Sequence, residues 1–475
     1  MSNLDNFFNS IIPAANLFTD HVEKGNYIRL VTHNDADGIS SGGILTACAY
    51  KMGARFKISS EKKLDEKLIA RLVEENPDLI VFSDFGSGYL DVISESLKQD
   101  IIILDHHMPQ ELEFDNIIHV SPMLHDVDGA RDIAASGVCY FFAKALDPSN
   151  VELAALGILG ALGDQQDKGE KKSLIGLNTV IEKDAIDNKL LDKHVGLIFY
   201  GYETRPIAKA IAYTTIPYIP GLSGNESNCV AFLKEIGIDI LDGGRLRALA
   251  DLTDEERTLL FSKLSNHMVS SGCDSNAIHQ LIGTIYTFKM EEQSTALRSG
   301  REYGSLLNAC GKMGRPSVGL SVVLGDRGDV MTEAQDTLAQ YRITISKALD
   351  WVQMNDSVEE QDHIYVIRAM NKVNDTVIGV VCGILLSQGI LKGNKPIVAS
   401  AYSEDDQLKI STRGTDELVE AGLHMGLVMQ EAAEPVEGGG GGHDIAAGAY
   451  IPMNKEREFL ENVNRLVAEK LAGNS

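Results

Sequence analysis

The N-terminal part of the chain alternates between two hydrophobic periods. Short apolar runs that are typical of buried strands alternate with segments of helical spacing. The strand-like runs are residues 27–32, 79–82, 101–104 and 117–120. The helical segments are residues 39–51, 64–75, 89–98, 136–146 and 151–163. Strands and helices that alternate at this length predict right-handed β-α-β units, a parallel sheet and an α/β fold.

Clusters rich in Asp and His follow three of the strand-like runs. They are His33-Asn34-Asp35-Ala36-Asp37-Gly38, Ser83-Asp84-Phe85-Gly86-Ser87-Gly88 and Asp105-His106-His107. A fourth cluster, Gly163-Asp164-Gln165-Gln166-Asp167, closes the last apolar helical segment. In a parallel sheet the carboxyl ends of the strands share one edge, where active crevices lie. We therefore expect these clusters to meet there.

The chemistry of these clusters favours a metal site. Carboxylates packed together raise one another's pKa and repel unless a cation neutralises them. Asp and His without Cys suit Mn²⁺ or Mg²⁺. A shared carboxylate could hold two ions about 3.5–4 Å apart, a pair that activates water for phosphoryl displacement. A single Asp after a strand is more often a helix cap or a turn residue, but four such clusters in one segment are difficult to explain as caps.

Two further regions follow the alternating segment. Residues 184–290 contain Pro206, Pro217, Pro220 and Leu-rich helical segments, which predict a mainly helical insertion or connector. Residues 291–475 predict a smaller mixed α/β domain. Its expected strands are 317–324, 363–370, 397–402 and 408–413, and its expected helices are 332–354, 416–431 and one from Met453 onward. The predicted domains are therefore 1–183, 184–290 and 291–475.

The third region carries candidate anion-binding groups. Five glycines, 438–442, precede His443. Successive glycines allow backbone N–H groups to turn toward an anion, and a flexible linker is the alternative. Arg413 ends a strand-like run, where its planar fork could pair with a phosphate or could lie at the surface.

A basic window near residue 300 stands out in an acidic chain. It contains Arg298, Arg301, Lys312 and Arg315, and it could follow a nucleic-acid backbone or be ordinary helical surface charge. The whole chain has a net charge of −25. Phosphate contacts need Lys and Arg, so nucleic-acid binding would require local basic groups and bound metals.

Other features limit the class of protein. No apolar run approaches the ~18 residues needed to span a bilayer. The N-terminus lacks a basic start and carries Asp5, unlike a secretory signal. The six cysteines include no C-x-x-C pair, which argues against a disulfide scaffold and a cysteine zinc site. We expect a cytoplasmic protein without membrane partners.

With these motifs in place, the chain resembles a known family. Asp105-His106-His107 matches the motif that names the DHH phosphoesterases, and the other three clusters match the family's remaining metal motifs in order. Within the DHH/DHHA1 family the chain is similar to the archaeal RecJ-like nucleases of the GINS-associated type. Residues 220–225 and 306–311 support this likeness, and the third region resembles the DHHA1 domain, whose signature is the Gly-rich stretch ending in His443.

The resemblance implies a role for each candidate residue. The metal ligands would be His33, Asp35, Asp37, Asp84, His106 and Asp164, with Asp84 bridging two ions. His107 would act on the substrate phosphate as a donor or proton carrier, and Asp105 would orient a neighbouring histidine. The substrate-binding candidates are Asn308, Arg315, Arg413, Gly440, Gly441, Gly442 and His443. Asn308 could instead cap a turn, and Asp167, which has no counterpart in the family, is interpreted as a surface residue.

The resemblance also implies an activity. It indicates an exonuclease on single-stranded DNA or RNA that uses two divalent cations, Mn²⁺ in preference to Mg²⁺, releases mononucleotides and serves DNA replication or repair. One alternative is a phosphoesterase for short oligonucleotides or cyclic dinucleotides. Another is a replication scaffold that binds GINS and the replicative helicase, with hydrolysis secondary.

Overall fold

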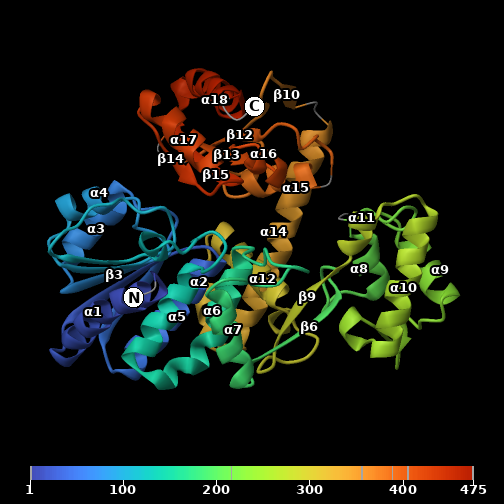
Figure 1. Cartoon of the computed structure of the whole chain (residues 1–475), viewed down its shortest axis with the longest axis horizontal. Coiled ribbons are helices and arrows are strands. Elements are labelled where there is room, and N and C mark those ends of the chain that lie inside the picture. Colours follow the sequence, from blue (N-terminus) through green and yellow to red (C-terminus); the bar gives the residue numbers. More distant parts are fainter. Residues whose placement is uncertain (1–2, 215–216, 355–356, 388, 404–405, 473–475) are drawn as a thin grey trace. The chain divides into compact units, whose positions relative to one another are not determined.

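The computed structural model describes residues 3–214, 217–354, 357–387, 389–403 and 406–472. The chain forms two compact units, Met1–Leu338 and Ala339–Ser475. In Figure 1 the first unit runs from blue to yellow and the second is orange to red. Within the described residues, no helix combines the length and apolar character that a membrane crossing requires.

A five-stranded parallel sheet forms the centre of the first unit. Its order is β2-β1-β3-β4-β5, and every neighbouring pair is parallel. The strands are β1 (Tyr27–His33), β2 (Arg55–Glu61), β3 (Leu79–Ser83), β4 (Asp100–Leu104) and β5 (Ile117–Val120). The predicted parallel α/β sheet is confirmed, and β2 is an additional edge strand.

Helices pack on this sheet or on the helices that cover it. They are α1 (Asn3–Glu23), α2 (Ala36–Lys51), α3 (Glu66–Glu75), α4 (Leu90–Ser96), α5 (Ala135–Leu146), α6 (Ala154–Gly163) and α7 (Asn178–Asp187). On one face, Leu72 of α3 and Ile93 of α4 share a buried cluster with Phe82 and Ile101 of the strands. Helices α1, α2 and α5 pack against strands of the same sheet and against one another.

The first unit continues through three more helices. They are α12 (Gly300–Lys312), α13 (Pro316–Val323) and α14 (Asp329–Met354), the last of which continues into the second unit. Residues 317–324 were expected to form a strand, and this prediction is wrong because they form α13. Pro316 occupies the first helical turn, where proline needs no hydrogen-bond partner for its nitrogen. Residues 291–338, grouped above with the third region, lie in the first unit.

The helical insertion is attached through two antiparallel strands. They are β6 (Leu191–Leu197) and β9 (Ile282–Phe288). Between them lie α8 (Ile207–Ala212), α9 (Glu226–Glu235), α10 (Asp254–Ser270), α11 (Ser275–His279) and the short pair β7 (Leu241–Asp242) and β8 (Arg245–Leu246). Ile211, Leu233 and Leu264 belong to its separate hydrophobic core.

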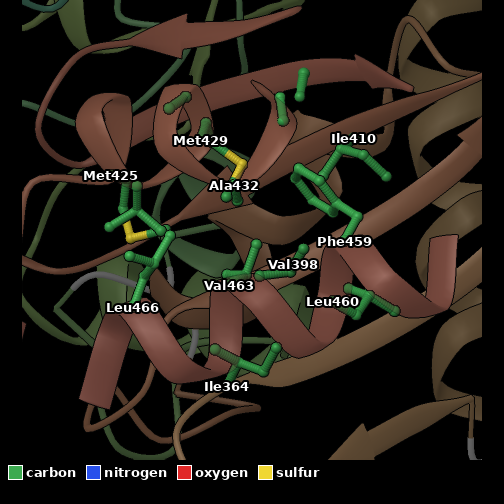
Figure 2. Close-up of a cluster of buried hydrophobic side chains, with 14 of the residues drawn as sticks. Ile364, Val398, Ile410, Met425, Met429, Ala432, Phe459, Leu460, Val463 and Leu466 are labelled. Carbon is green, nitrogen blue, oxygen red and sulfur yellow. The ribbon is translucent and has the colours of Figure 1, made fainter. Parts of the chain in front are cut away.

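The second unit is a mixed sheet with helices. Its order is β10-β11-β12-β13-β15-β14, in which only β11 and β12 are parallel to each other. The strands are β10 (Val358–Glu360), β11 (Tyr365–Met370), β12 (Ile397–Tyr402), β13 (Gln407–Arg413), β14 (Gly439–Gly442) and β15 (Ala446–Pro452). The helices are α15 (Ile378–Ser387), α16 (Asp416–Glu420), α17 (Met425–Ala433) and α18 (Glu456–Ala472). Figure 2 shows Phe459 and Val463 of α18 packed with Val398 and Ile410 of the sheet.

One prediction for this unit is wrong, and one alternative is excluded. Residues 416–431 form two helices rather than one, because Gly422 adopts a left-handed conformation (φ +96°) between α16 and α17. The glycine run is not a flexible linker, because Gly439–Gly442 is the edge strand β14. A Cβ on Gly440 would lie 2.4 Å from the Met429 carbonyl oxygen, so α17 needs a glycine there.

Candidate metal centre

Three neighbouring strands deliver polar side chains to one edge of the parallel sheet. His33 is the last residue of β1, while Asp84 and Asp105 directly follow β3 and β4. The register pairs Thr32 with Ser83, and Ser83 with Leu104. The next residue on each strand therefore reaches the same level. Asp84 leaves β3 in the left-handed region (φ 63°), a conformation that Asp tolerates better than most residues.

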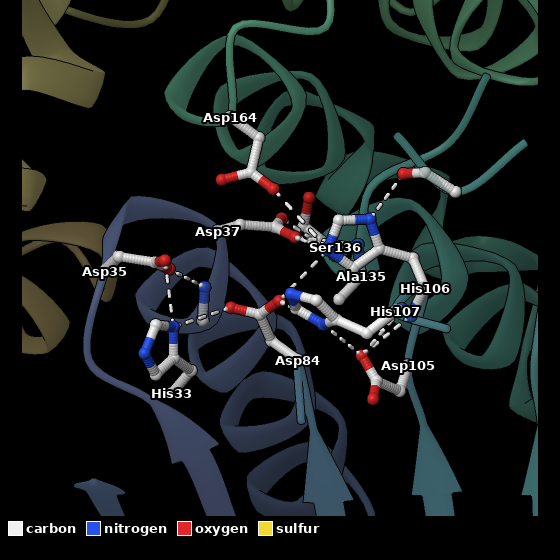
Figure 3. A network of polar contacts seen from close by, with 12 residues as sticks. His33, Asp35, Asp37, Asp84, Asp105, His106, His107, Ala135, Ser136 and Asp164 are labelled. Carbon is white, nitrogen blue, oxygen red and sulfur yellow. Dashed lines mark hydrogen bonds and ion pairs between the residues drawn. The ribbon is translucent and has the colours of Figure 1, made fainter. Parts of the chain in front are cut away.

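The side chains that meet at this edge form two groups that share Asp84. His33 Nδ1 lies 2.8 Å from Asp35 Oδ2 and 3.4 Å from Asp84 Oδ2. His106 Nε2 lies 3.3 Å from Asp84 Oδ1, 3.5 Å from Asp164 Oδ2 and 3.8 Å from Asp37 Oδ2. One oxygen of Asp84 thus faces each group, and Figure 3 shows its carboxylate between the two.

The orientation of His106 is fixed from behind. Its Nδ1 lies 2.6 Å from the Gly129 carbonyl oxygen, which can only accept a hydrogen bond. Nδ1 therefore carries a proton, and Nε2 is the nitrogen that faces the carboxylates. Gly129 allows this contact because a Cβ there would lie 1.8 Å from the His106 carbonyl oxygen.

Helix N-termini hold two of the carboxylates. Asp35 caps α2 by accepting a hydrogen bond from Gly38 N–H at 3.0 Å. Asp37 is buried and accepts hydrogen bonds from Ala135 N–H at 2.7 Å and Ser136 N–H at 2.9 Å, at the start of α5. These donors orient each carboxylate and partly compensate its charge.

Helix α12 supports the start of α2 and the end of α6, beside Asp35, Asp37 and Asp164. Asn308 Oδ1 accepts a hydrogen bond from Ala36 N–H at 3.0 Å, and its Nδ2 donates to the Gly163 carbonyl at 3.4 Å. Both ends of the Asn308 amide are thus engaged within the protein. These contacts favour a positioning role for Asn308, and its contact with substrate stays a prediction.

Asp105 organises the DHH segment and is itself completely buried. Its Oδ1 accepts hydrogen bonds from His106 N–H and from His107 Nδ1, each at 2.8 Å, and its Oδ2 accepts one from Ser87 N–H at 2.9 Å. Because Asp105 engages Nδ1 of His107, the nitrogen that can act on a substrate is Nε2. His107 is the more accessible of the pair, with 37% of its side chain exposed.

The electrostatics of the two groups indicate excess negative charge. Burial and the nearby Asp84 carboxylate raise the pKa of Asp37 to about 7. Burial, together with Asp37 and Asp35, holds the pKa of Asp164 well above its usual range. Burial alone would lower the pKa of His33, but Asp35 and Asp84 outweigh it and raise that pKa to about 10. The carboxylates thus hold protons at positions where a bound metal cation could compensate their negative charge instead.

The residues present fit divalent cations. Each group offers one histidine nitrogen and carboxylate oxygens whose ligand atoms lie within 4.8 Å of one another. Asp84 Oδ2 is buried and accepts no hydrogen bond of acceptable geometry within the described part of the chain. Such an oxygen is costly unless an ion compensates it. Oxygen and imidazole ligands without thiolate suit Mn²⁺ or Mg²⁺.

The predicted phosphate-binding residues of the second unit lie at one end of its sheet. Arg413 is the last residue of β13 and pairs with Ala446 of β15. His443 begins the turn from β14 to β15, where its N–H donates to the Ala446 carbonyl at 2.9 Å. Among the described residues, no carboxylate pairs with Arg413, and burial lowers the pKa of its guanidinium. Gly440, Gly441 and Gly442 belong to β14.

The basic window of the first unit is largely neutralised. Arg298 lies 3.8 Å from Glu203, and Arg315 lies 3.2 Å from Glu333. These ion pairs favour the interpretation as helical surface charge, and Arg315 stays only a proposed substrate contact. Asp167 was expected at the surface, but this is wrong because its side chain is 12% exposed and pairs with Arg301 at 2.5 Å. The roles of the Gly129 carbonyl and the Ser87 N–H were not predicted, since a backbone group that fixes a ligand leaves no signal in residue type.

Comparisons with known proteins agree with this architecture. The model of the DHH family N-terminal domain matches residues 27–161, that of the DHH-CID domain matches residues 199–282, and that of the DHHA1 domain matches residues 364–469. An uncharacterised protein of Methanocaldococcus jannaschii is 31% identical over 456 residues, which is 94% of each chain. The chain therefore belongs to the DHH/DHHA1 family, as a RecJ-like member.

Solved structures share the fold at low sequence identity. CDC45 from Entamoeba histolytica has a TM-score of 0.65 at 12% identity, with 97% of this chain and 99% of CDC45 covered. RecJ from Thermus thermophilus, solved with Mn²⁺, has a TM-score of 0.58 at 16% identity. That match covers 97% of this chain but only 55% of RecJ. At these identities the likeness establishes the fold alone.

Proposed function

We propose that the protein is an exonuclease that depends on divalent cations and removes mononucleotides from single-stranded DNA or RNA during DNA replication or repair. The observation that carries this proposal is the complete double donor set, in which the two oxygens of Asp84 face separate groups. His33 and Asp35 would complete one ligand set, and Asp37, His106 and Asp164 the other. Two cations, Mn²⁺ in preference to Mg²⁺, would activate water and neutralise the phosphate when bound.

The chain's own residues would bind and orient the substrate. His107, held by Asp105 at 2.8 Å, is placed to donate a hydrogen bond or a proton to a phosphate oxygen. Asp105 is the positioning residue that fixes the ring. Arg413 has no carboxylate partner among the described residues, which supports its assignment to a substrate phosphate. His443 and the edge strand Gly439–Gly442 would bind the substrate beside it.

Digestion of end-labelled single strands tests this proposal directly. DNA and RNA strands are incubated with Mn²⁺, with Mg²⁺ and with chelator. We expect mononucleotides only when a metal is present, and no cleavage by Asp84→Ala or His106→Ala. Asp115→Ala is the matched control, because Asp115 is an exposed carboxylate of the same domain. Cleavage by Asp84→Ala at the wild-type rate would refute the assignment.

Two other functions remain as alternatives. A small-substrate phosphoesterase would hydrolyse a dinucleotide or a cyclic dinucleotide faster than longer strands, whereas the proposed exonuclease would not, so a length series separates them. A replication scaffold is kept as a candidate because the fold is also that of CDC45. Co-purification with GINS and the helicase would support the scaffold, and the complete donor set favours hydrolysis.

A further inference from the structure

The helical insertion carries a row of alternating aromatic and cationic side chains. It consists of Tyr200, Arg205, Lys209 and Tyr213, and we call it the aromatic–cationic row. The guanidinium carbon of Arg205 lies 5.1 Å from the centre of the Tyr200 ring and 5.0 Å from that of Tyr213. Lys209 Nζ lies 5.7 Å from the Tyr213 ring centre. These distances are those of cation–π contacts.

The local sequence builds this row on one side of α8. Lys209 and Tyr213 are four residues apart, which places them on one face of α8, and Tyr213 caps its C-terminus. Arg205 lies before the helix, and its contact with the Tyr213 ring brings it to the same side. Ile207 and Ile211 point the other way, into the buried core of the insertion. Gly201 adopts a positive φ (+87°), and a Cβ there would lie 2.3 Å from Arg205 Cβ. The glycine thus lets the backbone beside Tyr200 approach Arg205.

The row presents rings and positive charge to solvent. Tyr213 is 60% exposed and Tyr200 is 38% exposed. Glu203 is the single acidic residue in the sequence between Phe199 and Pro220. Its side chain is buried and accepts a hydrogen bond from Ser294 N–H at 3.3 Å. The segment that carries the row thus has two cationic side chains and no exposed carboxylate, although the whole chain is acidic.

We propose that the aromatic–cationic row binds single-stranded nucleic acid, with bases stacked on Tyr200 and Tyr213 and phosphates paired with Arg205 and Lys209. A single strand alternates flat bases with anionic phosphates, and this row alternates flat rings with cations. Every base has a π-face, so such binding tolerates any sequence. The proposal rests on the proposed nuclease function, and it adds a strand contact outside the metal ligands.

Strand binding to the full-length protein tests this proposal. The probe is a long 5′-fluorescein oligothymidylate, and fluorescence anisotropy is recorded in chelator so that no cleavage occurs. We expect Tyr213→Ala to weaken binding about tenfold, through loss of one stacked base. Tyr213→Phe keeps the ring and should bind like the wild type. Tyr218→Ala is the matched control, because Tyr218 is also 60% exposed but lies outside the row.

The salt dependence of binding separates stacking from charge. Each phosphate contact contributes a slope of about 0.7 to the logarithmic plot of affinity against salt for single strands. Arg205→Ala and Lys209→Ala should each reduce the slope by about that amount. Tyr213→Ala should lower the affinity and leave the slope unchanged. Thermal melting of every variant verifies that the insertion is folded.

The outcomes also distinguish this proposal from the nuclease function. If the folded Tyr213→Ala and Arg205→Ala variants bind the oligothymidylate like the wild type, the proposed role of the row is wrong. It is also wrong if these variants fail to bind a protein partner while their affinity for the oligothymidylate is unchanged. Because anisotropy is measured without turnover, it does not depend on hydrolysis. If the variants cleave short oligonucleotides and also bind the strand like the wild type, the nuclease function stands and the role of the row is wrong.

Discussion

Strand β1 carries a buried charge system at each end, and the two are built differently. Near its start, the side chain of Arg29 is only 1% exposed and fully paired. It donates hydrogen bonds to Glu75 at 2.6 Å, to the Leu30 carbonyl at 2.7 Å and to Ser59 Oγ at 2.7 Å. The neighbouring strand and helix thus satisfy this cation completely, as a charge with a structural role requires.

At the other end of β1 the charges do not balance. Asp37 and Asp84 are almost fully buried beside Asp35 and Asp164, and burial with mutual repulsion raises the pKa of Asp37 to about 7. A bound cation can compensate this repulsion between the carboxylates. Buried charge that is paired internally supports the fold, whereas buried carboxylates that outnumber the cationic groups beside them mark a binding site. Substitutions at the two ends should therefore have opposite effects.

The largest expected effect is at Asp84. Asn has the same shape and also tolerates the left-handed conformation of this residue. Asp84→Asn should lower metal-dependent hydrolysis by more than about 100-fold, the upper range for mere supporting residues. In chelator its melting temperature should stay the same or rise, because one like charge is removed. Hydrolysis assays and thermal melting measure both, and a large loss of stability would show that the carboxylate is structural.

Arg29 should behave in the opposite way. Arg29→Met removes the buried partner of Glu75, which keeps only the exposed Lys57 at 2.7 Å, so the free energy of unfolding should fall by about 1–3 kcal/mol. Hydrolysis per folded molecule should be retained. Arg71→Met is the control, because its ion pair with Glu61 is half exposed and should contribute less than about 1 kcal/mol. Urea denaturation compares the two, and equal losses would contradict the distinction.

Metal binding should stabilise the wild type in a pH-dependent way. Mn²⁺ at a hundred times its Kd should add about 2.7 kcal/mol to the free energy of unfolding. Asp37, with a pKa of about 7, holds a proton below that pH, and the proton must leave when a metal binds. The stabilisation should therefore shrink as pH falls through about 7. Melting with and without Mn²⁺ on both sides of that pH tests this, and an equal shift at both would be inconsistent with it.

The smallest effect is expected at Asn308, which holds the Ala36 N–H and the Gly163 carbonyl beside the metal ligands. Asn308→Ala should weaken Mn²⁺ affinity about 10- to 100-fold, as loss of a supporting hydrogen bond does. Calorimetric titration measures the affinity. Ser305→Ala is a matched control on the same helix, because the Ser305 hydroxyl donates to the Arg301 carbonyl within the helix and contacts neither of those backbone groups. Unchanged affinity in Asn308→Ala would remove its positioning role.

Much of the first unit could be predicted because its strands are buried on both faces. Residues 79–82 and 101–104 are continuous apolar runs, and each becomes a central strand of the sheet. Strand β2 was missed because Arg55 and Lys57 are exposed at the sheet edge, so its sequence lacks an apolar run. Helix α13 was misassigned because its short apolar stretch fits either structure, and only Pro316 marks it as a helix.

The candidate site could be predicted in its side chains but not in its supports. His33, Asp84 and His106 follow recognisable runs, and the parallel register brings them together. Gly129 supports His106 through a backbone carbonyl, and Asn308 lies 272 residues after the Ala36 amide that it holds. Such contacts depend on tertiary structure, which residue type and spacing do not encode.

Anomalous diffraction at the manganese edge, from crystals grown with Mn²⁺, tests the central claim most directly. We predict two peaks per chain, one bounded by His33, Asp35 and Asp84 and the other by Asp37, His106 and Asp164, with Asp84 contacting both ions. A single peak remote from Asp84, or none at saturating Mn²⁺, would contradict the bridged site.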